Sequence, residues 1–126
     1  MAVYTVKQVA DLYGVSTHTI RFYDNAGLFP DVARGENGER LFSKEQLDWL
    51  NIVMCMRKTG LPIAGIRHYI ELSEQGDSTL EERYRIILEQ KKRAQAELEE
   101  CKNKLGVLER KEKWYLQMLD QAKQPI

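Results

Sequence analysis

The sequence predicts a mainly α-helical protein in which a winged helix-turn-helix domain precedes a long coiled-coil helix. Three observations predict this fold. Two short helical patterns are separated by Gly14, a hairpin pattern covers residues 28–42, and a last helical segment, which bears an apolar stripe, continues to about residue 122. We therefore expect residues 1–75 to form the winged domain, and residues 76–126 to form the long helix and a short tail.

The composition is that of a folded protein without membrane segments. An apolar content of 43% suffices for a core, and a charged content of 30% is typical of soluble proteins. No stretch is apolar enough to span a bilayer, and the start has no secretory signal, so we expect a cytoplasmic protein with no membrane partner. Cys55 and Cys101 lie far apart in the chain, which suits a reducing compartment.

The charge balance, taken alone, argues against nucleic acid as a partner. Residues 1–75 hold 8 Lys and Arg against 9 Asp and Glu, and residues 76–126 hold 11 against 10. Because neither part is basic, a DNA-binding function has to be argued from the positions of particular cations.

The first two predicted helices have start and stop signals. Thr5 with Gln8 forms a capping-box pattern, and Gly14 is expected to end the helix that follows. Ser16 is a good N-cap for the second helix, which we expect to end at Gly27.

The hairpin and two further helices follow. Residues 28–42 place Pro, Gly and Asn between apolar ends, which predicts a small hairpin, or wing. Ser43 with Gln46 forms a second capping box and opens a third helix, which closes near Gly60. Pro62 suits the first turn of a fourth helix.

The last segment begins after a break at residues 76–79, with Thr79 and Glu82 as its predicted cap. Its stripe has the 3-4 spacing of a coiled coil and consists of Leu80, Tyr84, Ile87, Lys91, Ala94, Leu98, Cys101, Leu105, Leu108, Glu112, Tyr115 and Leu119. One small domain cannot bury a stripe of this length. We therefore expect the helix to pair with a second copy in a homodimer.

Two charges in the stripe bear on the direction of that pairing. Lys91 and Glu112 lie about three turns either side of Cys101. In an antiparallel pair that crosses near Cys101, Lys91 of one protomer would lie near Glu112 of the other. The alternative interpretation is two independently solvated charges.

The predicted second helix has the chemistry of a DNA-reading element. Its outer face would present Thr17, His18 and Arg21, which can reach base edges and phosphates in a major groove. Its inner face would hold Ile20 with either Phe22 or Tyr23.

Four residues elsewhere are candidate contacts to the DNA backbone. The hydroxyl of Tyr23 could reach a phosphate, and Arg40 lies on the far side of the wing. Arg57 and Lys58 end the third helix, where they either contact a phosphate or only compensate the helix dipole.

These segments resemble the MerR family of transcription regulators. The resemblance is carried by the pattern GVS-x-x-TIR-x-YD-x-x-GL, followed by G-x-R-x-F and by CMRKTGLPIAGIRHYIEL, and it covers residues 3–75 closely. It implies dimers held by an antiparallel coiled coil of the last helix. The family's DNA contacts correspond here to Thr17, Arg21, Tyr23, Arg40 and Lys58.

The resemblance also implies a mechanism. Members bind double-stranded promoter DNA at inverted repeats, where the spacer between the two RNA polymerase recognition elements is too long. They activate transcription by bending and untwisting that spacer, which is a form of indirect readout.

Several features bear on the inducer. Residues 76–82 and the tail after Trp114 have no Cys, so we expect no metal site and no cofactor. The sequence ends at Ile126, so we also expect no large ligand domain of the drug-sensing type. The segment around Cys55 resembles the thiol- and aldehyde-stress branch, in which a lone Cys is proposed to sense electrophiles. Arg57, Lys58 and Arg67 could favour its thiolate. The alternatives are a different small-molecule effector and a Cys55 that is merely packed; Cys101 is expected in the coiled-coil core.

Two other classes of protein share single features of this sequence. A lone Cys can be a nucleophile, but no His or carboxylate partner stands at a recognisable spacing, so we do not expect an enzyme. A purely structural coiled-coil adaptor would leave Thr17, Arg21 and Arg40 replaceable without consequence.

Overall fold

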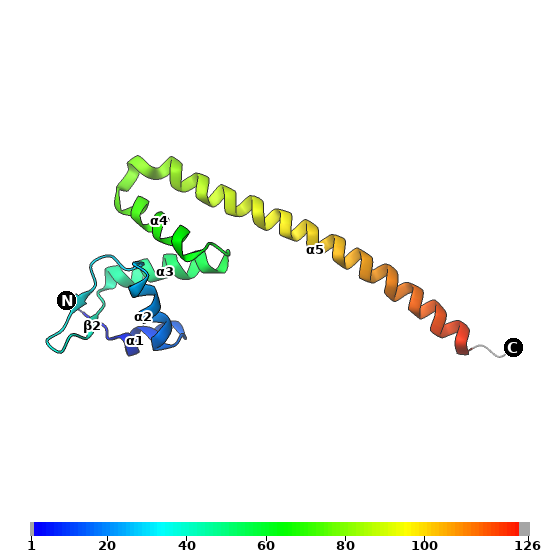
Figure 1. The fold of residues 1–126 in the computed structure, drawn as a ribbon, viewed down its shortest axis with the longest axis horizontal. Helices are drawn as coiled ribbons and strands as arrows, with labels where there is room; N and C mark the ends of the chain where they lie inside the picture. The colour runs from blue at the N-terminus through cyan, green and yellow to red at the C-terminus, as the bar shows by residue number, and fades with distance from the viewer. Residues whose placement is uncertain (1, 124–126) are drawn as a thin grey trace. The chain divides into compact units, whose positions relative to one another are not determined.

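The computed structural model describes residues 2–123, and most of them are helical (Figure 1). The elements in chain order are α1 Val6–Tyr13, α2 Thr17–Asn25, β1 Ala33–Arg34, β2 Arg40–Leu41, α3 Lys44–Lys58, α4 Ile63–Glu74, the short 3₁₀ helix η1 Gly76–Thr79, and α5 Leu80–Lys123. The chain divides into two compact units after Ile87. The winged domain followed by a long helix is thus confirmed.

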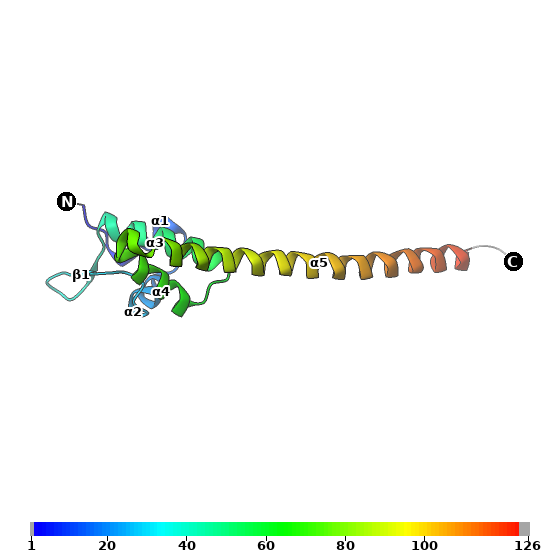
Figure 2. The same ribbon diagram turned by 90° about the horizontal axis from the view of Figure 1, so that it is seen from above.

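The first unit has one apolar core to which α1 to α4 and the wing all contribute, and Figure 2 shows these elements packed together. Its buried members are Val9, Ala10, Ile20, Tyr23, Leu28, Phe29, Phe42, Leu50, Val53, Leu61, Ile66 and Ile70. The rings of Phe29 and Phe42 meet edge to face with centroids 5.1 Å apart, which joins the start of the hairpin to its end.

The local signals in the sequence act as predicted in the first helices. The Thr5 hydroxyl accepts from the backbone N–H of Gln8 at 3.1 Å, and the Gln8 side chain accepts from the N–H of Thr5 at 2.9 Å. Gly14 ends α1 with φ 66°, a left-handed conformation that favours glycine. The Ser16 hydroxyl caps α2 by accepting from the N–H of Thr19 at 3.1 Å.

The wing is a two-residue ladder tied to the start of the chain. Strands β1 and β2 are antiparallel, and Arg34 pairs with Arg40. Beside this ladder, Tyr4 and Phe42 exchange two backbone hydrogen bonds of 2.8 Å. This bridge and the burial of Phe42 hold the end of the wing beside the N-terminal residues of the first unit.

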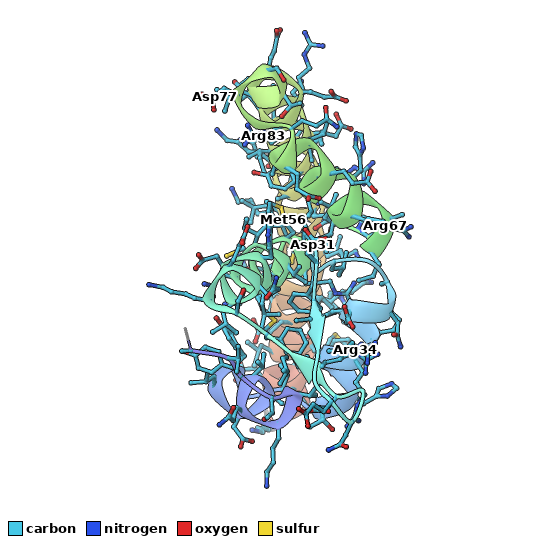
Figure 3. All side chains as sticks on the ribbon, turned by 90° about the vertical axis from the view of Figure 1, so that its left-hand side faces the viewer. Asp31, Arg34, Met56, Arg67, Asp77 and Arg83 are labelled. Carbon is cyan, nitrogen blue, oxygen red and sulfur yellow. The ribbon has the colours of Figure 1, made fainter. Side chains whose placement is uncertain are left out.

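The entry to α5 differs from the prediction. The Thr79 hydroxyl does not cap the helix with Glu82 but donates back to the carbonyls of Leu72 and Gly76, at 2.6 and 2.9 Å. Arg83, labelled in Figure 3, donates to the Thr79 hydroxyl at 3.0 Å and to the Gly76 carbonyl at 2.9 Å. The carbonyls left unpaired at the end of α4 thus compete for the hydroxyl, and α5 continues directly from η1. Pro62 is the N-cap of α4 and not a residue of its first turn.

Helix α5 continues without a break for 44 residues, through Gly106; its first residues, up to Ile87, belong to the first unit, and its remainder lies in the second. Its large apolar side chains are mostly exposed in the single chain, including Leu98 at 56%, Leu105 at 55% and Leu108 at 64%. Helical pairs of opposite charge line its surface, such as Glu81 with Arg85 at 2.7 Å. No helix among residues 2–123 is long and apolar enough to cross a membrane.

Candidate nucleic-acid interface

Helix α2 divides into an apolar inner face and a polar outer face. Ile20 is fully buried, whereas His18 and Arg21 are exposed and Thr17 is half-buried. The Arg21 guanidinium lies 3.4 Å from the Thr17 hydroxyl, one helical turn earlier. The three predicted major-groove residues therefore lie close together on one surface of α2.

The two aromatic residues of α2 take different environments. Tyr23 belongs to the core and is 8% exposed, whereas Phe22 is 48% exposed. The structure thus selects Tyr23 as the inward residue. A phosphate contact by the Tyr23 hydroxyl stays a prediction, and the packed ring restricts it to the small exposed part of the side chain.

Arg40, the predicted wing contact, lies against the end of α2. Its Nε is 2.6 Å from Oδ2 of Asp24, and its Nη2 donates to Oδ1 of Asn25 at 2.8 Å. The side chains of Arg40 and Asp24 are only 14% and 13% exposed. This ion pair joins β2 to α2 across the helix-turn-helix and the wing.

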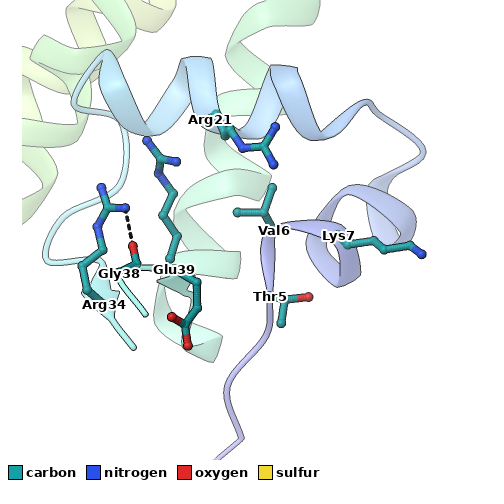
Figure 4. Close-up of a pocket in the computed structure, with 8 residues that line it drawn as sticks. Thr5, Val6, Lys7, Arg21, Arg34, Gly38 and Glu39 are labelled. Carbon is teal, nitrogen blue, oxygen red and sulfur yellow. Dashed lines mark hydrogen bonds between the residues drawn. The ribbon is translucent and has the colours of Figure 1, made fainter. Parts of the chain in front are cut away.

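A pocket of about 250 Å³ opens between the start of α1, the outer face of α2 and the wing (Figure 4). It is lined by Thr5, Val6, Lys7, Arg21, Arg34, Gly38, Glu39 and Arg40. Four of these residues are cations and one is an acid, so the excess charge that the whole domain lacks is concentrated here. A polyanionic backbone is the kind of ligand that such a surface attracts.

Sequence reasoning missed Lys7 and Arg34 as members of this pocket. Figure 4 shows Arg34 on the wing, with its Nη1 bonded to the Gly38 carbonyl at 3.0 Å, and Lys7 on α1. The signal for Arg34 was its place in the hairpin, across the predicted turn from Arg40. Lys7 had no such signal, because α1 meets the wing only through tertiary packing.

The end of α3 presents the remaining predicted residues. Cys55, Arg57 and Lys58 are all exposed, and the two cations occupy the last turn of the helix. The side chain of Arg67 lies beside the turn that follows α2. Its Cδ would be 3.6 Å from a Cβ added to Gly27. Among residues 2–123, no three His, Cys, Asp or Glu side chains are grouped to hold a metal ion.

These features together define a class of protein. A capped α1, a glycine turn, an α2 with a polar outer face, and a wing that borders the same cationic pocket form a winged helix-turn-helix of the DNA-binding type.

The comparisons with known proteins specify the family. Residues 4–73 match the family described as MerR HTH family regulatory protein. An HTH-type transcriptional regulator of Haemophilus influenzae is 38% identical over 112 residues, which are 89% of this chain and 83% of the relative. The chain belongs to the MerR family of DNA-binding transcription regulators, and it is not an enzyme.

Other relatives agree. The regulator AdhR of Bacillus subtilis is 35% identical over 70% of this chain and 63% of its own. Among solved structures, that of HiNmlR, a MerR family regulator lacking the sensor domain, bound to promoter DNA, is 36% identical with a TM-score of 0.73, and the match covers 92% of each chain. A MerR family protein of Listeria monocytogenes is 32% identical with a TM-score of 0.78, over 95% of this chain and 91% of that one.

Proposed function

We propose that the protein is a cytoplasmic homodimer that binds an inverted-repeat promoter with an overlong spacer. It activates transcription by bending and untwisting the spacer, so that both recognition elements face RNA polymerase. It does so in response to electrophile, aldehyde or thiol stress. The observation that carries this proposal is the continuous α5 with its exposed apolar stripe. Burial of the stripe requires a second copy of the chain, and that copy brings a second winged helix-turn-helix domain, or reading head.

The dimer follows from the cost of exposing the stripe to water. Leu98, Leu105, Leu108, Tyr115 and Leu119 are each more than half exposed along one continuous helix. Burial of each such side chain contributes about 1.5–3 kcal/mol, so pairing with an equal stripe is strongly favoured. An antiparallel arrangement brings Lys91 of each protomer near Glu112 of the other, at two places along the seam.

The DNA contacts are assigned from the face that each head presents. Thr17, His18 and Arg21 enter the major groove from the exposed surface of α2. Arg57 and Lys58, at the exposed end of α3, contact phosphates, where they also favour the helix dipole. The hydroxyl of Tyr23 and the wing complete the backbone contacts.

Distortion of the DNA follows from the separation of two heads joined by a stiff coiled coil. Each head binds its half-site, and DNA between them must deform for both to be seated. The contacts made by the second head offset the energy of deformation. The promoter-bound relative supports DNA as the ligand of this fold.

Cys55 is the proposed sensor of the inducer. Its thiol is exposed on α3, so a small electrophile can reach it. Arg57 and Lys58 lie close to it in sequence. Exposure in the single chain speaks against the alternative in which Cys55 is merely packed in the domain core. The similarity to AdhR supports a place near this branch of the family.

The experiment is a transcription assay with a matched pair of promoters. One template carries the natural promoter beside the gene of this protein, and the other has its spacer shortened to the ordinary length. We expect the protein to raise transcription from the long-spacer template and to leave or lower it on the short one. Equal activation of both templates would refute activation by distortion. Footprinting of each template measures DNA binding separately from activation.

A further inference from the structure

The wing places two arginines opposite each other, and the structure treats them differently. Arg34 on β1 and Arg40 on β2 are direct partners in the ladder. Like charges in opposed positions repel each other, so one of them gains from an acid of its own. Arg40 has that acid in Asp24, whereas Arg34 forms no ion pair within residues 2–123.

Arg40 is poorly placed to leave its site for a phosphate. Its Nε lies 2.6 Å from the Asp24 carboxylate, and both side chains are less than 15% exposed. Movement of the guanidinium would leave the Asp24 carboxylate almost buried and unpaired. That carboxylate also stands in the last turn of α2, which holds no basic residue and where the helix dipole disfavours a negative charge.

Arg34 has the opposite properties. It is exposed, and it lines the same pocket as Arg21, one of the predicted major-groove residues on the outer face of α2 (Figure 4). One of its donors is bonded to the Gly38 carbonyl, which holds the guanidinium in place. Arginine has five N–H donors, so others remain to bind a phosphate.

We propose that the two arginines of the wing have different roles. Arg40 is a positioning residue that fastens the wing to α2 through Asp24 and Asn25, and Arg34 is the wing residue that contacts a DNA phosphate. This inference rests on the proposed DNA-contact surface. It replaces the sequence-based expectation that Arg40 itself touches the backbone.

Asp24→Asn gives the first test. Whether Arg40 contacts a phosphate or only positions the wing decides the direction in which the affinity for DNA changes. Loss of an acid near DNA normally strengthens binding, and it would also release Arg40 to a phosphate. If Arg40 only positions the wing, loss of its partner weakens binding, by about tenfold. The measurement is the Kd for a duplex spanning the promoter beside the gene. Binding that is unchanged or tighter overturns the proposal.

The dependence of Kd on salt gives the second test, because the slope of log K against log salt counts neutralised phosphates. In a homodimer, Arg34→Ala removes two contacts and should lower the slope by about 1.8. The double variant with Arg40→Gln should lower it no further, because without its fastening the wing already loses the Arg34 contact. An unchanged slope for Arg34→Ala, or a fall of about 3.6 for the double variant, overturns the proposal.

Controls separate this inference from the proposed surface and from folding. Arg110→Ala removes an exposed cation of α5 and should leave the slope unchanged. Arg21→Ala should weaken binding whichever arginine serves the wing, so its failure to do so contradicts the proposed surface and not the division of roles. Circular dichroism melts confirm that each variant is folded at the assay temperature; Arg34 is exposed, so its variant tests the proposal even if Arg40→Gln unfolds.

Discussion

Gln46 joins the cap of α3 to the first limb of the wing. Its Oε1 accepts from the backbone N–H of Ser43 at 2.6 Å, while its Nε2 donates to the Pro30 carbonyl at 3.0 Å. The side chain is 6% exposed, so both ends of the amide are used within the protein. The sequence predicted the capping box, but the second bond links residues 16 apart in the chain and belongs to the tertiary structure.

Gln46→Glu should therefore destabilise the domain while it retains the capping oxygen. The carboxylate loses the donor to Pro30 and places two acceptors together in a buried site, which costs about 2 kcal/mol of unfolding free energy. Urea unfolding followed by circular dichroism measures it. Gln117→Glu, on the exposed surface of α5, is the matched control and should change the unfolding free energy by less than about 0.5 kcal/mol. Equal stabilities would show that the Pro30 bond is dispensable.

Arg21→Ala should weaken promoter binding without affecting the fold. Arg21 is exposed and supports no core contact, so the variant loses a groove or phosphate interaction worth about 2 kcal/mol at each half-site, or about a thousandfold in the affinity of a dimer that loses it at both. Fluorescence anisotropy with the promoter duplex measures the Kd. Arg110→Ala, on α5, should bind as the wild type does. An unaltered Kd for Arg21→Ala would remove α2 from the reading surface.

Leu105→Asp should dissociate the proposed dimer. The substitution places two carboxylates in the apolar seam near the point where the helices cross, and charges there lose their hydration. Sedimentation equilibrium at micromolar concentration should show a monomer. Asn103→Asp adds the same charge on the opposite face of α5 and should leave the dimer intact. A dimer that persists in Leu105→Asp would mean that another surface holds the two copies together.

Lys91→Glu and Glu112→Lys test the antiparallel direction of the seam. Each single reversal should place like charges together at two places along the seam, which costs about 1 kcal/mol in all, or about fivefold in the dimer Kd. The double reversal should restore the wild-type Kd at low salt. If the double variant is weaker than either single variant, the two residues do not meet across the seam and the charges are independently solvated.

Cys55→Ser should abolish the response to an aldehyde on a reporter promoter. The hydroxyl occupies nearly the same space as the thiol but does not form the nucleophilic anion near neutral pH. Cys101→Ser, on the predicted seam of α5, is the matched control and should respond as the wild type does. An unchanged response of Cys55→Ser would leave a regulator with another small-molecule effector.

The local features of this chain were predictable because their causes lie within a few residues. The two capping boxes, the Ser16 cap and the glycine stop of α1 depend on hydrogen bonds between neighbours in sequence. The length of α5 followed from the absence of proline and from its apolar period. The Thr79 cap failed as a prediction, because the carbonyls at the end of α4 compete for the same hydroxyl.

The DNA-contact surface could be predicted from the sequence only in part. The sequence by itself determined that this protein has a helix-turn-helix, a wing and a long helix with an apolar seam, since spacing and local hydrogen bonds specify these elements. Only the tertiary structure decided that Tyr23 rather than Phe22 packs inward, that Asp24 engages Arg40, and that Lys7 joins Arg34 at one pocket. The physical reason is that a side chain's environment depends on which distant segment packs against it, and no short window of sequence contains that segment.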